Sequence, residues 1–240
     1  MNIQICKFGG TSLSNDERCQ YALNICKEKA KQGKVIVVVS AMGRYGDPYA
    51  TDTLASLGNE YLSEQETARL LSMGELVSSI RFCSKLRACG INAYALSFKE
   101  TGILTDDNYL CANVVTMDPH DFKQMLDAYD VLVVCGFIGM NSIGEITTLG
   151  RGGSDYTAVL VAKMLDVSEV EIYTDVDGVY DSDPKINKNA KKYKEITYHH
   201  MLALHCRVIH DRCIDFAAQN HIRIFLKGTF SDDVGTIIKR

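Results

Sequence analysis

The sequence contains no long hydrophobic run, and its longest purely aliphatic stretch covers only residues 35–39. A helix that spans a membrane needs about 20 apolar residues, so we expect no such span. The N-terminus also lacks the apolar core of a signal peptide. Positive charge is not in excess, because the formal net charge is −4, and this argues against a general nucleic-acid-binding protein. We therefore expect neither a membrane nor a nucleic acid as a partner.

Disulfide and metal-binding patterns are missing as well. The nine cysteines form no Cys-x-x-Cys pair, and their odd number is typical of reduced thiols in the cytoplasm. Histidines and cysteines gather between residues 199 and 213, where zinc is one interpretation, but no established zinc motif accompanies them. The aspartates of residues 175–183 lack the final glutamate of a calcium-binding EF-hand loop. We therefore expect a cytoplasmic protein in which no side-chain cluster holds a metal ion.

Three common active-site signatures are also absent. The sequence has no Walker A phosphate loop, no G-x-G-x-x-G fingerprint after a strand and no G-x-S-x-G hydrolase motif. What remains is an ordinary soluble composition, 46% hydrophobic and 23% charged. The 240 residues suffice for one large core.

The most informative segment is LGRGGSDYTA, Leu149–Ala158. Ser154 is a good helix N-cap, and the apolar residues that follow it predict a helix. The loop would then lie at a helix N-terminus, where free N–H groups and the helix dipole favour a bound anion. With Arg151 and Asp155 beside it, the loop suits an acidic substrate next to a phosphate. Three glycines leave its backbone open to close approach: Gly150, Gly152 and Gly153.

A second glycine loop, KFGGTS, follows a predicted strand at the start of the chain. Lys7 stands at the end of that strand and could reach a phosphate as a point charge. The amides of the Gly9–Gly10 turn could hydrogen-bond the same phosphate. Either glycine loop, taken alone, could instead be only a tight turn.

Strands and helices are predicted to alternate along the chain. Helical patterns lie between apolar, β-branched segments, and this alternation predicts a largely parallel sheet with helices on both faces. Ligands of such sheets bind at the carboxyl ends of the strands, where both glycine loops would lie. The predicted strands are Ile3–Lys7, Val35–Ser40, Asn92–Leu96, Val131–Cys135, Val170–Thr174 and Ile222–Leu226.

Capping patterns predict where helices begin. Asp118 and Pro119 match an N-cap and a first helical residue. Two capping boxes are predicted: Ser14 with Glu17, and Ser63 with Glu66.

Two further candidate residues follow from the pattern alone. Asp175 comes directly after a predicted strand and could contact a ribose or an amine, with Tyr180 against a nucleotide ring. Glu75 lies in an apolar helical segment, where it is either at the helix surface or a ligand for an ammonium group. The pattern by itself favours the surface position.

Several motifs, in order along nearly the whole chain, resemble aspartokinases of the amino-acid kinase superfamily. The run SAMGRYGDPYATDTL is similar to the bacterial monofunctional type. The resemblance implies a three-layer αβα sandwich around a mostly parallel eight-stranded central sheet. The motifs are KFGGTS (7–12), VVVSAMG (37–43), ATDTL (50–54), SMGELVSS (72–79), GFIG (136–139), TTLGRGGSDYTA (147–158) and TDVDGVYDSDPK (174–185).

The resemblance also implies a reaction, which is transfer of the ATP γ-phosphoryl group to the β-carboxylate of L-aspartate. Mg²⁺ would be held mainly by the nucleotide phosphates. A carboxylate is already nucleophilic at neutral pH, so catalysis would consist of positioning and charge neutralisation.

The family's catalytic and substrate-binding residues map onto matching positions. Lys7 would meet the transferring phosphoryl group, and Asp155 would organise Lys7. Arg151 would hold the α-carboxylate of the substrate, and Glu75 its α-amino group, which replaces the surface interpretation of Glu75. The resemblance assigns phosphate binding to Gly9, Gly10 and Gly153, and substrate orientation to Ser40, Thr51 and Ser154. It assigns nucleotide binding to Thr174, Asp175, Tyr180, Asp183, Lys185 and Arg207.

The chain departs from the family pattern in three respects. Residues 205–211 replace the family motif G-A-K-V-x-H-P, so that Arg207 takes the place of a nucleotide-binding lysine. Lys185 stands where an arginine is common. No paired ACT regulatory domains follow the motifs, so we expect one catalytic domain over residues 1–240 without feedback by lysine or threonine through such domains.

Two other functions stay open from the sequence. A shared fold and phosphate site do not fix the acceptor, so a kinase for another amino acid or small carboxylate is one alternative. A nucleotide-binding regulatory subunit with little activity is the other, and the altered residues 205–211 favour it. A homodimer and a separate regulatory chain are further hypotheses about partners.

Overall fold

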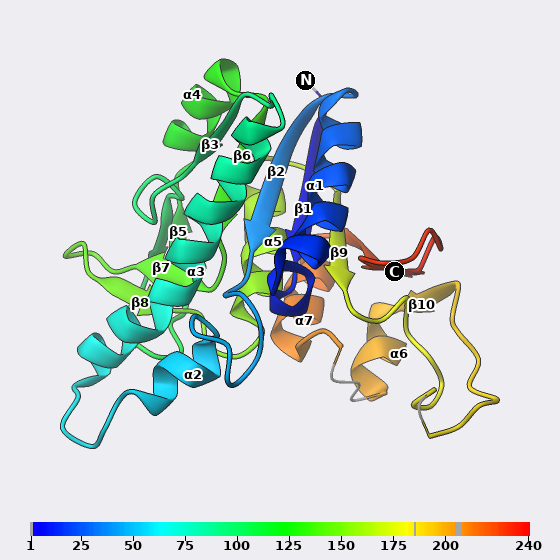
Figure 1. The fold of residues 1–240 in the computed structure, drawn as a ribbon. Helices are drawn as coiled ribbons and strands as arrows, with labels where there is room; N and C mark the ends of the chain where they lie inside the picture. Colours follow the sequence, from blue (N-terminus) through cyan, green and yellow to red (C-terminus); the bar gives the residue numbers. More distant parts are fainter. Residues whose placement is uncertain (1, 185, 205–207) are drawn as a thin grey trace.

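The computed structural model describes residues 2–184, 186–204 and 208–240. At its centre lies an eight-stranded sheet (Figure 1). β11 and β12 are antiparallel, and the other neighbouring strands of this sheet are parallel. The mostly parallel eight-stranded sheet is therefore confirmed. Its strands in spatial order are β10 (Glu195–Thr197), β12 (Thr236–Lys239), β11 (Arg223–Gly228), β9 (Glu169–Thr174), β1 (Ile3–Phe8), β2 (Lys34–Val39), β6 (Val131–Cys135) and β3 (Ala93–Ala95).

Strands β2 and β6, in the sheet interior, form because almost all their side chains are apolar on both faces. β6 is buried along its whole length, and β2 is buried from Val35 onward. Such strands have no polar face to turn toward water, so helices must cover both sides of the sheet. All six predicted strands are present, with small differences at their ends.

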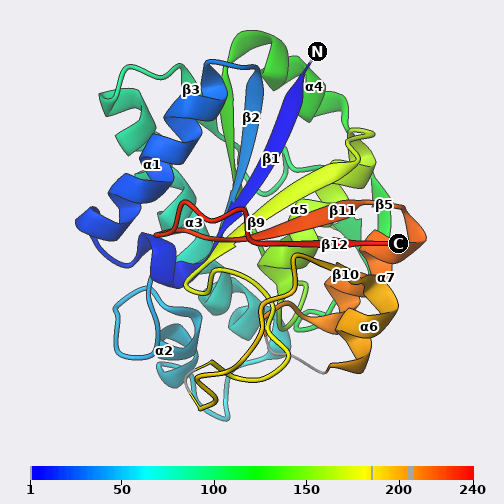
Figure 2. The same ribbon diagram turned by 90° about the vertical axis from the view of Figure 1, so that its right-hand side faces the viewer.

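Helices form a layer on each face of the sheet (Figure 2). On one face, α1 (Asp16–Ala30) and α3 (Glu64–Ala88) pack through Leu23, Phe82 and Leu86. The opposite face is covered by α4 (His120–Ala128), α5 (Gly153–Met164), α6 (Tyr198–Ala203) and α7 (Asp211–Gln219). The three-layer αβα arrangement is thus confirmed. Two short helices, η1 (Gly10–Leu13) and α2 (Thr51–Ser56), follow β1 and the loop after β2.

The helix starts agree with the predictions only in part. The capping box of Ser63 and Glu66 is present at the start of α3. The box predicted at Ser14 is wrong, because the side chain of Asn15 accepts the Arg18 amide and α1 begins one residue later. The helix after Asp118 also starts one residue later than predicted, at His120, whose amide donates to Oδ1 of Asp118.

A second, four-stranded sheet was not predicted. It consists of β5 (Val114–Met117), β4 (Ile103–Thr105), β7 (Ile138–Met140) and β8 (Ile146–Thr148), in that spatial order. Three of these strands have only three residues, too few for alternation to be recognised. The sheet matters for the site, because β8 leads directly into the glycine loop at residues 149–153.

None of the helices in the described ranges combines the length and the apolar character needed to cross a membrane. The cysteines in those ranges are all free thiols, most of them buried.

Candidate active site

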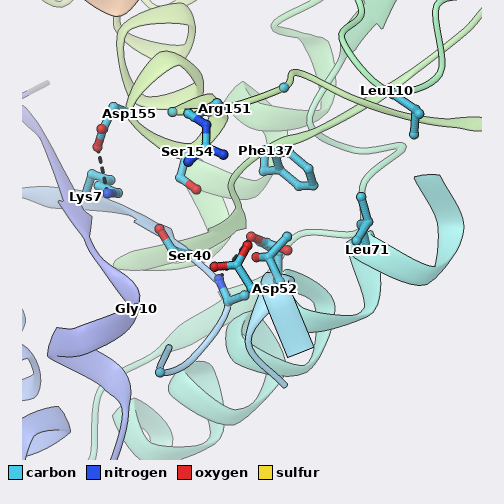
Figure 3. A pocket seen from close by; sticks show the side chains of 17 residues that line it. Lys7, Gly10, Ser40, Asp52, Leu71, Leu110, Phe137, Arg151, Ser154 and Asp155 are labelled. Carbon is cyan, nitrogen blue, oxygen red and sulfur yellow. Dashed lines mark hydrogen bonds and ion pairs between the residues drawn. The ribbon is translucent and has the colours of Figure 1, made fainter. Parts of the chain in front are cut away.

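The carboxyl ends of β1 and β2 open into a cavity of about 440 Å³ (Figure 3). Loops after these two strands, the buried side of α3 and the start of α5 form its walls. This is the edge of the sheet at which ligands were expected. Nine predicted site residues line the cavity: Lys7, Gly10, Ser40, Thr51, Glu75, Arg151, Gly153, Ser154 and Asp155.

Lys7 and Asp155 form an ion pair at one end of the cavity. The Lys7 Nζ lies 2.7 Å from Oδ1 of Asp155, and the residues are only 8% and 7% exposed. Within the described part of the chain, Oδ1 of Asp155 has no well-aligned hydrogen bond, so its attraction to the Lys7 ammonium is mainly one of charge. The pair places one cation and one anion where the strand β1 meets the first turn of α5.

The loop before α5 depends on its glycines. Gly150 and Gly152 have φ angles of +73° and +71°, a region that other residues rarely adopt. A Cβ at Gly153 would lie 2.8 Å from the Phe137 ring. Because Gly152 takes the N-cap position, the prediction of Ser154 as the N-cap is wrong, and Ser154 lies in the first helical turn. The loop still presents a helix N-terminus to the cavity, as expected for an anion site.

The N-terminal glycine loop is equally close-packed. A Cβ at Gly10 would lie 2.4 Å from the carbonyl oxygen of Ala41, so the loops after β1 and β2 touch backbone to backbone. The amide of Gly9 donates to the Tyr173 carbonyl at 3.1 Å and Gly9 does not line the cavity. In the structure, Gly9 therefore joins β1 to β9, and its proposed role as a phosphate donor would require that bond to be exchanged.

Glu75 is the residue of the cavity best suited to contact a cationic group. It is only 2% exposed, so the surface position favoured by the pattern is wrong. Its Oε1 accepts the Ala41 amide at 3.1 Å, whereas Oε2 is buried with no hydrogen-bond partner among the described residues. Burial raises the pKa of this carboxyl to about 8. A buried carboxylate oxygen without a donor is costly, and a ligand ammonium would satisfy it.

The raised pKa of Glu75 has a testable consequence for stability. The pKa of this carboxyl is near 4.5 in the unfolded chain and about 8 in the folded protein. Between these values the folded protein binds a proton that the unfolded chain releases, so this group lowers stability progressively as the pH rises through the window. We expect Glu75→Gln to raise the free energy of unfolding by roughly 2–4 kcal/mol at about pH 9 and by little at about pH 5.

Urea unfolding of the ligand-free protein at both pH values measures this effect. Glu28→Gln is the matched control, because its side chain is 66% exposed and should not alter the pH dependence. An equal difference between the Glu75 variant and the unaltered protein at the two pH values would contradict the assignment.

Beyond the nine predicted residues and the loop glycines Gly150 and Gly152, six residues line the cavity: Ala41, Gly43, Asp52, Leu71, Leu110 and Phe137. Leu71, Leu110 and Phe137 form an apolar wall on the side away from Lys7 (Figure 3), and Asp52 lies near Thr51. Asp52 and Phe137 belong to the motifs ATDTL (50–54) and GFIG (136–139), so the resemblance to the family could have identified them as site residues. Leu71 and Leu110 carry no chemical signal, because only the tertiary packing brings them to the cavity.

Of the six predicted nucleotide-binding residues, Thr174 and Asp175 lie at the end of β9, outside the cavity. β9 pairs with β1, so that Ile172 is opposite Lys7, and Thr174 and Asp175 therefore emerge at the same sheet edge. Oδ2 of Asp175 forms a 2.7 Å ion pair with Arg44. The remaining predicted residues follow in the next loop or fall outside the described residues. The Tyr180 hydroxyl donates to Oδ1 of Asp177. The backbone carbonyl of Asp183 accepts the amides of Ile186 and Asn187. Lys185 and Arg207 lie outside the described residues.

The described ranges hold no group of three or more histidine, cysteine or acidic side chains arranged to bind a metal ion. Of the histidine and cysteine cluster, His205 and Cys206 lie outside those ranges.

The chain resembles known proteins over almost its full length. The family model described as "Amino acid kinase family" matches residues 2–228. Aspartokinase 1 of Bacillus subtilis (strain 168) is 40% identical over 245 residues, a match that covers 99% of this chain and 61% of that protein. The chain thus spans about three-fifths of the length of this curated relative.

Solved structures give the same picture. The aspartate kinase from Synechocystis superposes with a TM-score of 0.87 at 32% identity, over 99% of this chain and 40% of that one. Aspartokinase III of E. coli, solved in complex with aspartate and ADP, superposes with a TM-score of 0.83 at 26% identity, over 100% of this chain and 65% of that one.

Proposed function

The chain belongs to the amino acid kinase family, and on that premise we propose that it transfers the γ-phosphoryl group of ATP to the β-carboxylate of L-aspartate. The products would be 4-phospho-L-aspartate and ADP. One observation supports the choice of an amino-acid acceptor. A single cavity contains an arginine, a lysine and a buried carboxylate oxygen that has no hydrogen-bond partner among the residues that the structure describes.

The charges of the cavity match those of an acidic amino acid. The α-ammonium group of aspartate would contact Oε2 of Glu75, and the α-carboxylate would bind the guanidinium of Arg151. Ser40, Thr51 and Ser154 offer hydroxyl groups around the same space. The β-carboxylate would then point toward Lys7, at the end where the nucleotide phosphates are expected.

The reaction needs no general base. An oxygen of the β-carboxylate attacks the γ-phosphorus in line, and the bond from phosphorus to the bridging oxygen of ADP breaks. The new P–O bond makes an acyl phosphate, and ADP leaves with the electron pair of the broken bond. Lys7 and the N–H groups at the start of α5 would neutralise charge on the phosphoryl oxygens, while Asp155 keeps the Lys7 ammonium in place.

ATP would bind across the end of β9, with Thr174, Asp175, Tyr180, Asp183, Lys185 and Arg207 as the proposed contacts. Mg²⁺ would take its main ligands from the phosphates, a mode that requires only one or two protein carboxylates, of which the cavity offers Asp155. It would supply further charge neutralisation at the transferring phosphoryl group.

Asp175 gives a specific expectation for nucleotide binding. Asp175→Asn should raise the KM for ATP about tenfold, because a hydrogen bond to a charged carboxylate becomes a weaker one to a neutral amide, and leave the KM for aspartate nearly unchanged. Arg44→Ala is the matched variant, since it removes the ion pair but keeps the carboxylate. If both variants raise the KM for ATP equally, Asp175 acts only through Arg44 and the proposed contact is wrong.

The function is tested by ADP release from the purified protein with ATP, magnesium and a panel of acceptors. Turnover with aspartate supports the proposal. Turnover only with another amino acid or small carboxylate supports the first alternative, and ATP binding without turnover supports a regulatory subunit. We further propose that residues 1–240 act as one catalytic domain in the cytoplasm, where free cysteines stay reduced.

A further inference from the structure

Arg212, in the first turn of α7, contacts Leu149, Ala112 and Tyr156, each of which lies within two residues in the chain of a residue that lines the cavity. Its Nη1 donates to the Leu149 carbonyl at 2.9 Å, and its Nη2 donates to the Ala112 carbonyl at 2.8 Å. The guanidinium also lies 4.4 Å from the centre of the Tyr156 ring. Arg212 does not line the cavity, and none of the predicted functions included it.

The two carbonyls belong to the segments that shape the site. Leu149 is the first residue of the glycine loop (residues 149–153), and Ala112 lies two residues after Leu110, which lines the cavity. Both residues are fully or almost fully buried, so their carbonyl oxygens need a donor. Within the described part of the chain, the Arg212 guanidinium is the donor found for both of them. A planar guanidinium can serve two acceptors at once, which a lysine ammonium does less well.

Two backbone hydrogen bonds restrain the glycine loop, from the Gly153 amide to the Gly150 carbonyl at 3.0 Å and from the Leu149 amide to the Phe137 carbonyl at 2.7 Å. Gly150 and Gly152 give its backbone freedom, and in the described chain no side chain caps the N-terminus of α5. Tyr156, under the guanidinium, lies in the first turns of the same helix. Arg212 therefore fixes the loop at its start and the helix at its beginning, with Arg151 held between the two.

His210 adds a contact at the same place. It caps α7 by accepting the Arg212 amide, and a Cβ at Gly152 would lie only 2.3 Å from the His210 Cβ. The N-terminal end of α7 is thus packed directly against the glycine loop.

We propose that Arg212 is a positioning residue that holds the glycine loop, and through it Arg151, in the geometry that binds the acceptor. The expected effect on aspartate kinetics rests on the proposed function. The restraint of the loop by Arg212 does not depend on that function. It assigns a function to the segment beside residues 205–211, where the sequence departs from the family pattern.

Two variants test the role: Arg212→Met, which removes both hydrogen bonds, and Arg212→Lys, which keeps the charge. We expect Arg212→Met to lower kcat/KM for aspartate about tenfold or more, with the KM for ATP changed less than about threefold. Arg212→Lys should recover only part of the loss. Arg223→Met is the control, because Arg223 also lies over a ring, that of Phe225, and pairs with Glu169. Arg223 is the first residue of β11, whereas the cavity lies at the carboxyl ends of β1 and β2.

Amide hydrogen exchange gives a readout that does not depend on the acceptor. In the Arg212 variants, the amides of residues 149–155 should exchange about tenfold faster or more, while those of β2 and β6 remain as slow as in the unaltered protein. Unchanged exchange in this loop would overturn the proposal, as would equal effects on aspartate and ATP in a folded variant. If the unaltered protein does not use aspartate, the proposed function fails and the exchange result alone decides the role of Arg212. If Arg212→Met does not fold, the same measurements on Arg212→Lys decide it.

Discussion

Lys7→Ala is expected to lower kcat with aspartate at least about a hundredfold, because it removes the cation that neutralises the phosphoryl group in the transition state. The Lys7 Nζ is the positive charge at the end of β1, with 8% of the residue exposed and Asp155 at 2.7 Å. Little water reaches this site to replace the lost charge. Steady-state kinetics at saturating ATP and aspartate measure the effect.

Stability must be separated from catalysis in this experiment. Loss of Lys7 leaves Asp155 buried without its partner, which can cost about 3–5 kcal/mol of stability. The double variant Lys7→Met with Asp155→Asn removes both charges and should fold better than Lys7→Ala, yet remain as inactive. Lys29→Ala is the matched control, since Lys29 also pairs with a carboxylate, Glu171 at 2.6 Å, but does not line the cavity. Near-normal kcat in folded Lys7→Ala would rule out the assigned role.

Arg151→Ala and Glu75→Gln are expected to impair the use of aspartate far more than the binding of ATP. The two side chains would hold opposite ends of one amino acid, so each loss should cost roughly 2–5 kcal/mol in kcat/KM for aspartate if the pair is desolvated by the substrate. The effect of Glu75→Gln would follow from charge, because glutamine retains the size of Glu75 and its acceptor for the Ala41 amide. Kinetics with each substrate varied in turn, together with direct binding of ATP, provide the measurement.

Arg81→Ala is the control for the arginine variant. Arg81 pairs with Asp16 at 2.7 Å and does not line the cavity, so its loss should leave both substrates unaffected. Equal losses in aspartate use and ATP binding after Arg151→Ala would indicate misfolding or a different acceptor site.

The sequence predicted the central part of the fold because its signals there are strong. The strands β2 and β6 are almost wholly apolar on both faces, and the capping box at Ser63 is local chemistry that needs no tertiary information. The second sheet could not be predicted, because strands such as β7 have too few residues to show a period. The helix start at Gly153 was misplaced since a left-handed Gly152 can take the N-cap position that Ser154 was expected to fill.

The site residues also fall into those with a local sequence signal and those placed only by tertiary packing. Charged residues in glycine loops, such as Lys7 and Arg151, were recognisable from sequence and meet in the cavity. Glu75 was ambiguous from the pattern alone, because helical periodicity does not show that a carboxylate is buried among apolar neighbours. Leu110 and Arg212 could not be predicted, since each acts through a partner more than thirty residues away in the chain.

The most direct test of the central claim is to trap the product chemically. An acyl phosphate reacts with hydroxylamine to give a hydroxamate, so the protein, ATP, magnesium and aspartate are incubated with hydroxylamine and the product is identified by mass and NMR. The proposed reaction predicts the β-hydroxamate of aspartate, formed in proportion to ADP and only when aspartate is present. The α-hydroxamate, or ADP formation without any hydroxamate, would contradict phosphoryl transfer to the β-carboxylate.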